Sequence, residues 1–232
     1  MVYFEMFINF QKICKMIRTD NLNPTELPYG NESSNRIYEM LFCDNTEFFR
    51  PEKKFESVYP WNILFSNKYL TDELLKITSD SGLESRIKIL AYNKLLSSGF
   101  KPAKKELLGI IIEVGLAQGL DVVAAYRDGT ARYINYTERM IFWDSPVAES
   151  NNIIDHLFNE SEIVLKQIGP WNKARLKYPG EGMVRISFLV SDGLYFGQGA
   201  SETFFNERLS RSIMKYGSVL MTFLINISNE KG

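Results

Sequence analysis

The stretch LLGIIIEVGLAQGLDVVAAYRDGTARYINYTERMIFW, residues 107–143, decides the fold class. Its first run, Leu107–Leu116, is apolar almost throughout, which is typical of a central strand that is buried on both faces. Three further runs are predicted as strands: Leu120–Tyr126, Thr130–Tyr136 and Arg139–Trp143. Because consecutive strands joined by tight turns pair antiparallel, the stretch predicts an α+β domain rather than a doubly wound sheet.

The dipeptide Asp128-Gly129 predicts a two-residue type I′ turn, which needs positive φ at both positions. That turn fixes a register in which Arg127 lies opposite Thr130 and Val123 lies opposite Ile134. One face of the hairpin is then expected to be core, with Leu120, Val122, Ala124, Tyr126, Ala131, Tyr133, Met140 and Phe142. The other face mixes polar and apolar residues: Asp121, Val123, Arg127, Arg132, Ile134, Tyr136, Arg139, Ile141 and Trp143.

Three arginines on this mixed face suggest a site for an anionic ligand. Guanidinium groups match the geometry of carboxylate and phosphate, so Arg127, Arg132 and Arg139, with Trp143, are the candidate ligand-binding residues. The alternative is a solvated sheet face on which Arg132 stacks on Trp143 as a cation–π pair. A polar stripe is more often a solvated face.

Sequence on both sides of this stretch predicts helices and a second hairpin. Ser81 and Glu84 match a capping box that opens a helix ending at Gly99. After the stretch, Ser145-Pro146 begins a helix that ends at Gly169-Pro170, and residues 172–182 form a basic loop. The remaining expected elements are a strand Val184–Val190, a turn at Asp192-Gly193, a helix from Ser201 to about Lys215, and an apolar segment Val219–Ile227. The sheet should therefore have about five to six strands, built as a meander plus a hairpin.

The expected domain organisation is one α+β domain behind a short extension. Residues 1–35 are predicted to be an apolar N-terminal extension followed by a polar linker, because residues 19–35 are rich in Pro, Gly, Asn and Ser. Residues 36–232 are predicted to be the domain, with residues 36–100 mainly helical and residues 101–232 holding the sheet and further helices. The apolar start is interrupted by polar residues and is too short to span a membrane, so we expect an intracellular, cytoplasmic protein without a transmembrane segment.

Composition restricts the chemistry. The net charge is −1, and the basic excess typical of nucleic-acid binding is missing. The two cysteines, Cys14 and Cys43, lack metal-site spacing, and His156 is the single histidine. We therefore expect no cofactor and no metal site. The catalytic candidates are Glu113, the one acid in the apolar strand, and His156. The alternatives are a paired or exposed Glu113 and a structural His156.

Five segments carry a resemblance to a known family, over most of residues 28–227. They are YPWNILFS (59–66), LESRIKILAYNKL (83–95), LLGIIIEVGLAQGLDVVAAYRDGTARYIN (107–135), IGPWNKARL (168–176) and VRISFLVSDGLYFGQG (184–199). Together they resemble a family of bacterial conserved hypothetical proteins of unknown function. The resemblance implies a bacterial cytosolic setting, and it implies nothing about mechanism.

Two functions are compatible with these patterns. The first is a non-catalytic cytosolic module that binds a ligand, a protein partner or a second copy of the chain. The second is a small hydrolase or transferase for an anionic substrate, with the hairpin arginines as binding groups and Glu113 or His156 as base. A closed pocket with Arg132, Arg139 and Glu113 convergent favours the enzyme, whereas scattered arginines favour the binding module.

Overall fold

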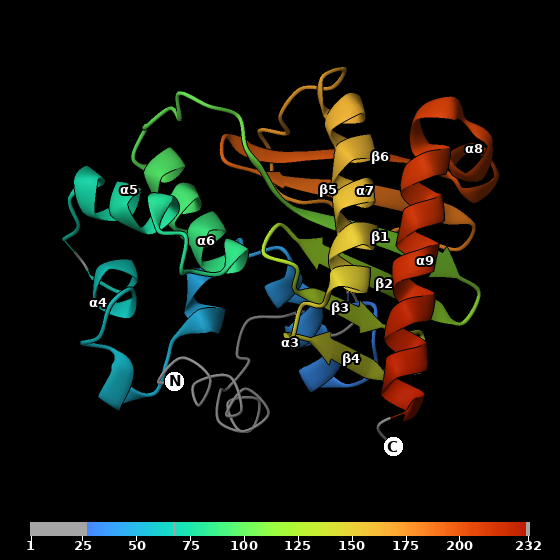
Figure 1. Ribbon diagram of the computed structural model, residues 1–232, viewed down its shortest axis with the longest axis horizontal. Helices are drawn as coiled ribbons and strands as arrows, with labels where there is room; N and C mark the ends of the chain where they lie inside the picture. Colours follow the sequence, from blue (N-terminus) through green and yellow to red (C-terminus); the bar gives the residue numbers. More distant parts are fainter. Residues whose placement is uncertain (1–26, 67, 231–232) are drawn as a thin grey trace.

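A six-stranded antiparallel sheet organises the molecule (Figure 1). The computed structural model describes residues 27–66 and 68–230. The strands are β1 (Leu107–Leu116), β2 (Gly119–Tyr126), β3 (Ala131–Ile134), β4 (Met140–Trp143), β5 (Met183–Val190) and β6 (Gly193–Ala200), in the order β4-β3-β2-β1-β5-β6. The predicted α+β class, with a meander and a hairpin, is confirmed.

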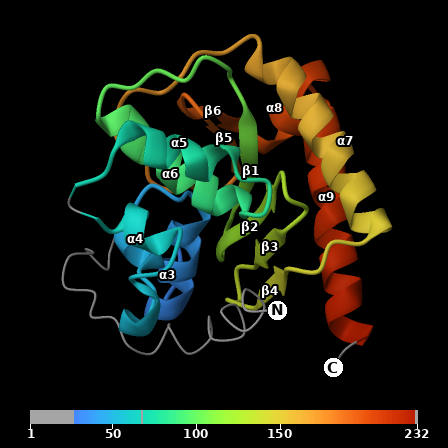
Figure 2. The same ribbon diagram turned by 60° about the vertical axis from the view of Figure 1, so that its left-hand side comes forward.

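Helices cover both faces of the sheet (Figure 2). One face carries α3 (Glu32–Leu41), α4 (Trp61–Leu64), α5 (Thr71–Ser79) and α6 (Ser85–Ser97), with two short 3-10 turns, Thr46–Phe49 and Lys53–Phe55. The other face carries α7 (Ala148–Leu165), α8 (Ser201–Asn206) and α9 (Arg208–Glu230). The sheet is therefore the middle layer of three, and the expectation that one hairpin face is solvated is wrong.

Strand β1 is central, as its apolar run predicts. It pairs with β2 on one side and with β5 on the other. Successive side chains of a strand point to opposite faces, and here both faces are core: Ile111 packs in the α3–α6 layer, whereas Ile110 and Ile112 pack in the α7–α9 layer. Burial on both sides removes the alternation that marks a half-exposed strand.

The β2–β3 hairpin differs from its prediction by one residue. The Tyr126 amide donates to the Thr130 carbonyl, so the loop is the three residues Arg127–Gly129, and Ala124 rather than Ala125 lies opposite Arg132. Gly129 has φ +84°, which is typical of a three-residue hairpin whose last loop position is left-handed. The dipeptide therefore located the turn correctly, but it did not fix the loop length.

The changed register divides the predicted core face between two layers. Of its members, Leu120, Val122, Ala124, Tyr126, Met140 and Phe142 lie in the α3–α6 layer, whereas Ala131 and Tyr133 lie in the α7–α9 layer. Arg132 moves with Tyr126 to the α3–α6 side and is buried. A register change of one residue alters the face of every side chain of a strand.

Two hairpin turns supply carboxylates that accept hydrogen bonds at the N-termini of helices earlier in the chain. The Asp128 carboxylate accepts the Ser85 amide at 2.6 Å, so α6 begins at Ser85 rather than at the predicted capping box of Ser81. The Glu138 carboxylate accepts the amides of Gly30 and Asn31 and the hydroxyl of Ser34, at the start of α3. These carboxylates satisfy amides that have no partner within the helix.

Two predicted boundaries also shift. Helix α3 begins at Glu32, and Tyr29 is buried in the core, so a domain boundary at residue 36 is too late. The predicted extension before residue 27 lies outside the described residues. At the other end, α9 is one helix through Glu230, where a helix to Lys215 and a separate apolar segment were expected. The second hairpin is confirmed, with Val190 opposite Gly193.

We predict that Gly129→Ala destabilises the protein by about 1–3 kcal/mol, the cost of a non-glycine residue in a left-handed position. A Cβ at Gly129 would also lie 2.6 Å from Asn151 Oδ1 and 3.0 Å from Pro146. Urea unfolding measures the loss. Gly169→Ala is the matched control, because a Cβ there meets nothing within 4 Å; equal losses in the two variants contradict the prediction.

Candidate functional site

The predicted arginine site does not form, because its members lie on different faces. Arg132 is 3% exposed on the α3–α6 side, forms an ion pair with Asp144 at 2.5 Å, and donates to the carbonyls of Ala131 and Trp143. Its guanidinium lies over the ring of Phe142, not over Trp143. The predicted Arg132–Trp143 stack is therefore wrong.

The other two arginines lie at opposite ends of β3. Arg127 forms an ion pair with Glu162 and lies over the ring of Phe158, both on α7. Arg139 donates to Ser228 and Asn229 near the end of α9. Arg127 and Arg139 thus each contact a helix, and the three arginines do not converge on one ligand.

Trp143 is a packing residue in this structure. Its indole nitrogen donates to the Ser150 hydroxyl at 3.2 Å, and its ring meets Phe223 edge-on. Both partners belong to the α7–α9 layer. The layer of α7 and α9 explains the placement, because it covers the sheet face that Trp143 shares with Val123 and Ile141.

Glu113 lies in the middle of the sheet and is 0% exposed. It lies directly opposite Arg185 of β5, and its two oxygens accept from Arg185 Nε at 2.5 Å and Nη2 at 2.6 Å. The Tyr38 hydroxyl donates to the same carboxylate at 2.6 Å. Of the alternatives for Glu113, the structure shows the buried, paired one, and a carboxylate with these partners has no open side for substrate.

Tyr38 and Arg185 keep the protonation states that this pairing needs. Burial and the charge of Glu113 raise the pKa of Tyr38, so its hydroxyl stays a donor. Burial works against the charge on Arg185, but its bonds to Glu113 outweigh burial and raise its pKa. Two charges removed from water remain charged only when they are paired and hydrogen-bonded in this way.

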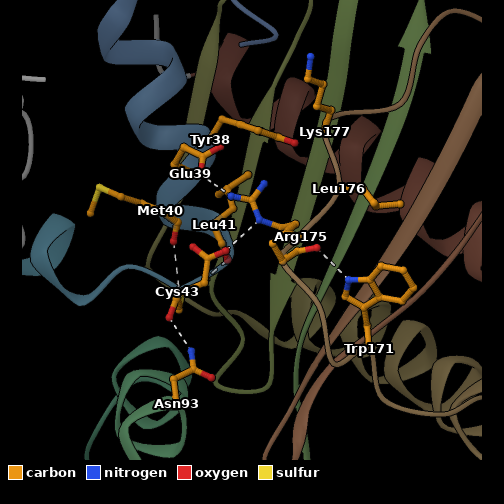
Figure 3. A network of polar contacts seen from close by, with 12 residues as sticks. Tyr38, Glu39, Met40, Leu41, Cys43, Asn93, Trp171, Arg175, Leu176 and Lys177 are labelled. Atoms are coloured by element: carbon orange, nitrogen blue, oxygen red, sulfur yellow. Dashed lines mark hydrogen bonds and ion pairs between the residues drawn. The ribbon is translucent and has the colours of Figure 1, made fainter. Parts of the chain in front are cut away.

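The network continues from the sheet into the basic loop and α3. Arg185 Nη1 donates to the carbonyls of Leu176 and Lys177. Arg175, the residue before Leu176, pairs with Glu39 of α3 (Figure 3). It also pairs with Asp44 and lies 3.9 Å above the Phe42 ring. The basic loop is thus fixed to α3 by an ion pair and to β5 by hydrogen bonds from Arg185, although most of its residues are exposed.

His156 has a different environment. It is exposed on α7, and its ring stacks on Tyr216 of α9 at 4.9 Å between centroids. Such a stack joins the two helices and does not place the imidazole beside a nucleophile. Within residues 27–66 and 68–230, no group of three or more His, Cys, Asp or Glu side chains is arranged to hold a metal ion.

A cavity of about 180 Å³ lies between the sheet and α9. It is lined by Ile112, Val114, Asp121, Val122, Val123, Tyr133, Phe205, Met214, Gly217, Ser218 and Met221. Gly217 allows α9 to approach the sheet closely, because a Cβ there would lie 2.4 Å from Ile112 Cδ1. The wall is apolar except for a few groups, as is usual for a ligand site.

Asp121 and Tyr133 are the polar pair of this cavity. The Tyr133 hydroxyl donates to Asp121 Oδ2 at 3.0 Å, and the Tyr136 amide donates to Oδ1 at 2.8 Å. Burial and the neighbouring Asp121 charge raise the pKa of Tyr133. Sequence reasoning placed Asp121 on the mixed hairpin face, but it did not identify the cavity, because the opposite wall comes from α8 and α9.

No family model matches the sequence, and no match is found among curated proteins or among solved structures. None of the helices within the described residues is both long enough and apolar enough to cross a membrane. The site must therefore be interpreted from its own chemistry.

We predict that Glu113→Gln destabilises the protein by about 3–5 kcal/mol, because it leaves the buried Arg185 charge without its counter-charge. Arg185→Met should cost a similar amount, and the double variant should lose less than the sum of the single losses. Denaturant unfolding of the four proteins gives this comparison. Strictly additive losses would show that the two side chains do not stabilise each other.

The matched control for this cycle is a surface pair. Lys54 and Glu52 lie 3.1 Å apart with both side chains largely exposed. Lys54→Ala should cost at most about 1 kcal/mol, as for other exposed ion pairs.

Proposed function

We propose that the protein is a non-catalytic binding module of the cytosol, and that its ligand is a small molecule with an apolar body. The observation that carries the proposal is the cavity between β1, β2 and α9. Its walls come from a rigid sheet and a long helix, and elements of that kind hold a binding site in a fixed shape.

The size of the cavity sets the size of the ligand. An engineered apolar cavity of about 150 Å³ in another protein binds benzene, and drug-sized ligands need about 300–1,000 Å³. A cavity of about 180 Å³ therefore suits one ring or a short branched chain. Phe205, which is 45% exposed, lies at its edge, where a ligand would cover it.

The polar groups of the cavity favour binding over catalysis. The Ser218 hydroxyl donates to the Met214 carbonyl within α9, and the Tyr133 hydroxyl donates to Asp121. Burial and the Asp121 charge raise the pKa of Tyr133, so its hydroxyl keeps its proton, and the Ser218 hydroxyl bonds to a carbonyl, which cannot act as a base. The hydrolase or transferase alternative loses its support, since the arginines are dispersed and Glu113 is enclosed.

The test fills the cavity with a large side chain. Benzyl alcohol should produce saturable NMR shifts in cavity residues of the native protein. Met221→Trp should abolish them, because residue 221 lines the cavity, whereas Thr222→Trp should leave them intact, because Thr222 is exposed and lies outside it. Melting temperatures of both variants establish that they are folded. Shifts that persist in Met221→Trp, or that never saturate, contradict the proposal.

A further inference from the structure

We infer that the ligand of this cavity carries a positive charge, as an ammonium group on a small apolar body, and that Asp121 is its counter-ion. This inference rests on the proposed function and adds the chemical class of the ligand. It follows from the position of Asp121, which is the one acid among the residues that line the cavity, and from the neutral groups that donate to it.

Several acids elsewhere in the described part of the chain have arginine partners. Glu113 pairs with Arg185, Asp144 pairs with Arg132, and Glu39 and Asp44 share Arg175. A charge removed from water costs free energy unless an opposite charge or several hydrogen bonds compensate it. Other half-buried acids accept only from neutral groups, but Asp128 and Glu138 hold the starts of α6 and α3 and do not line the cavity.

Asp121 lacks such a partner within the part of the chain that the structure describes. Its oxygens accept only from neutral donors, the Tyr133 hydroxyl and the Tyr136 amide. Arg139 acts electrostatically on Tyr133, but it directs its guanidinium to Ser228 and Asn229 instead. The net charge at this wall of the cavity is therefore negative.

The carboxylate has room to accept more hydrogen bonds. An ionised carboxylate offers about four lone-pair sites on its two oxygens, and an ammonium offers three donors. Asp121 uses two of these sites within the protein. Hydrogen bonds between two charged groups are roughly twice as strong as neutral ones, and the apolar wall strengthens them further.

The rest of the lining selects the body of the ligand. Val114 and Val123 belong to the sheet, and Met214 and Met221 belong to α9; all four border the same space as Asp121. Methionine adapts to ligands of irregular shape. A neutral ligand would leave the carboxylate uncompensated and an anionic one would be repelled, so the arrangement fits a primary alkyl- or arylammonium ion.

The experiment compares probes of equal size and different charge on the full chain. Benzylamine, which is protonated at neutral pH, should bind at least about tenfold more tightly than benzyl alcohol. Asp121→Asn should remove this preference and leave the affinity for benzyl alcohol unchanged. Tyr133→Phe is the matched control, because it removes a neutral hydrogen bond to Asp121 and keeps the charge, so the preference should persist.

Salt gives a second measurement that needs no variant. Raising the concentration from about 0.05 M to about 0.5 M should weaken benzylamine and leave benzyl alcohol unaffected, because salt screens only the charged contact. Equal affinities for the two probes in the native protein, or tighter binding of phenylacetate, would overturn the inference and leave the binding proposal standing. If no probe produces saturable shifts in the cavity, the binding proposal itself fails.

Discussion

The ion pair between Glu113 and Arg185 constrains the centre of the sheet, and the layers on both sides depend on it. A slip of one residue between β1 and β5 would send one charge to the opposite face and leave the other unpaired in the core. The same arginine holds two carbonyls of the basic loop, and the same carboxylate holds Tyr38 of α3. One pair therefore fixes strand register, loop position and the docking of a helix.

The sequence predicted the features that local chemistry determines. The strand positions, both hairpins and the left-handed Gly99 at the end of α6 follow from apolar runs, turn residues and glycine. Features that depend on distant partners were missed. The turn at Asp128 has one residue more than expected, and Asp128 in this turn caps α6. The mixed face of the hairpin is buried because α7 and α9 cover it.

The functional residues show the same difference between features set by local sequence and features set by distant partners. Glu113 and Arg185 each stand alone as a charge in an apolar strand, and the rule that buried charges are paired could have joined them before the structure was known. Asp121 gave no such signal, since its importance arises from a cavity whose other wall is formed by Gly217 and its neighbours on α9. A cavity between elements far apart in sequence leaves no local pattern in the sequence.

The capping of early helices by later turns has a consequence for synthesis of the chain. Protein chains emerge from the ribosome N-terminus first, so α3 and α6 are made before Glu138 and Asp128, which complete their first turns. Helix α3 has a local cap in Asn31, but α6 has no side-chain cap of its own at Glu84. The first turn of α6 therefore gains its capping carboxylate only after the β2–β3 hairpin has been translated. The α3–α6 layer thus depends on strands that are synthesised after it.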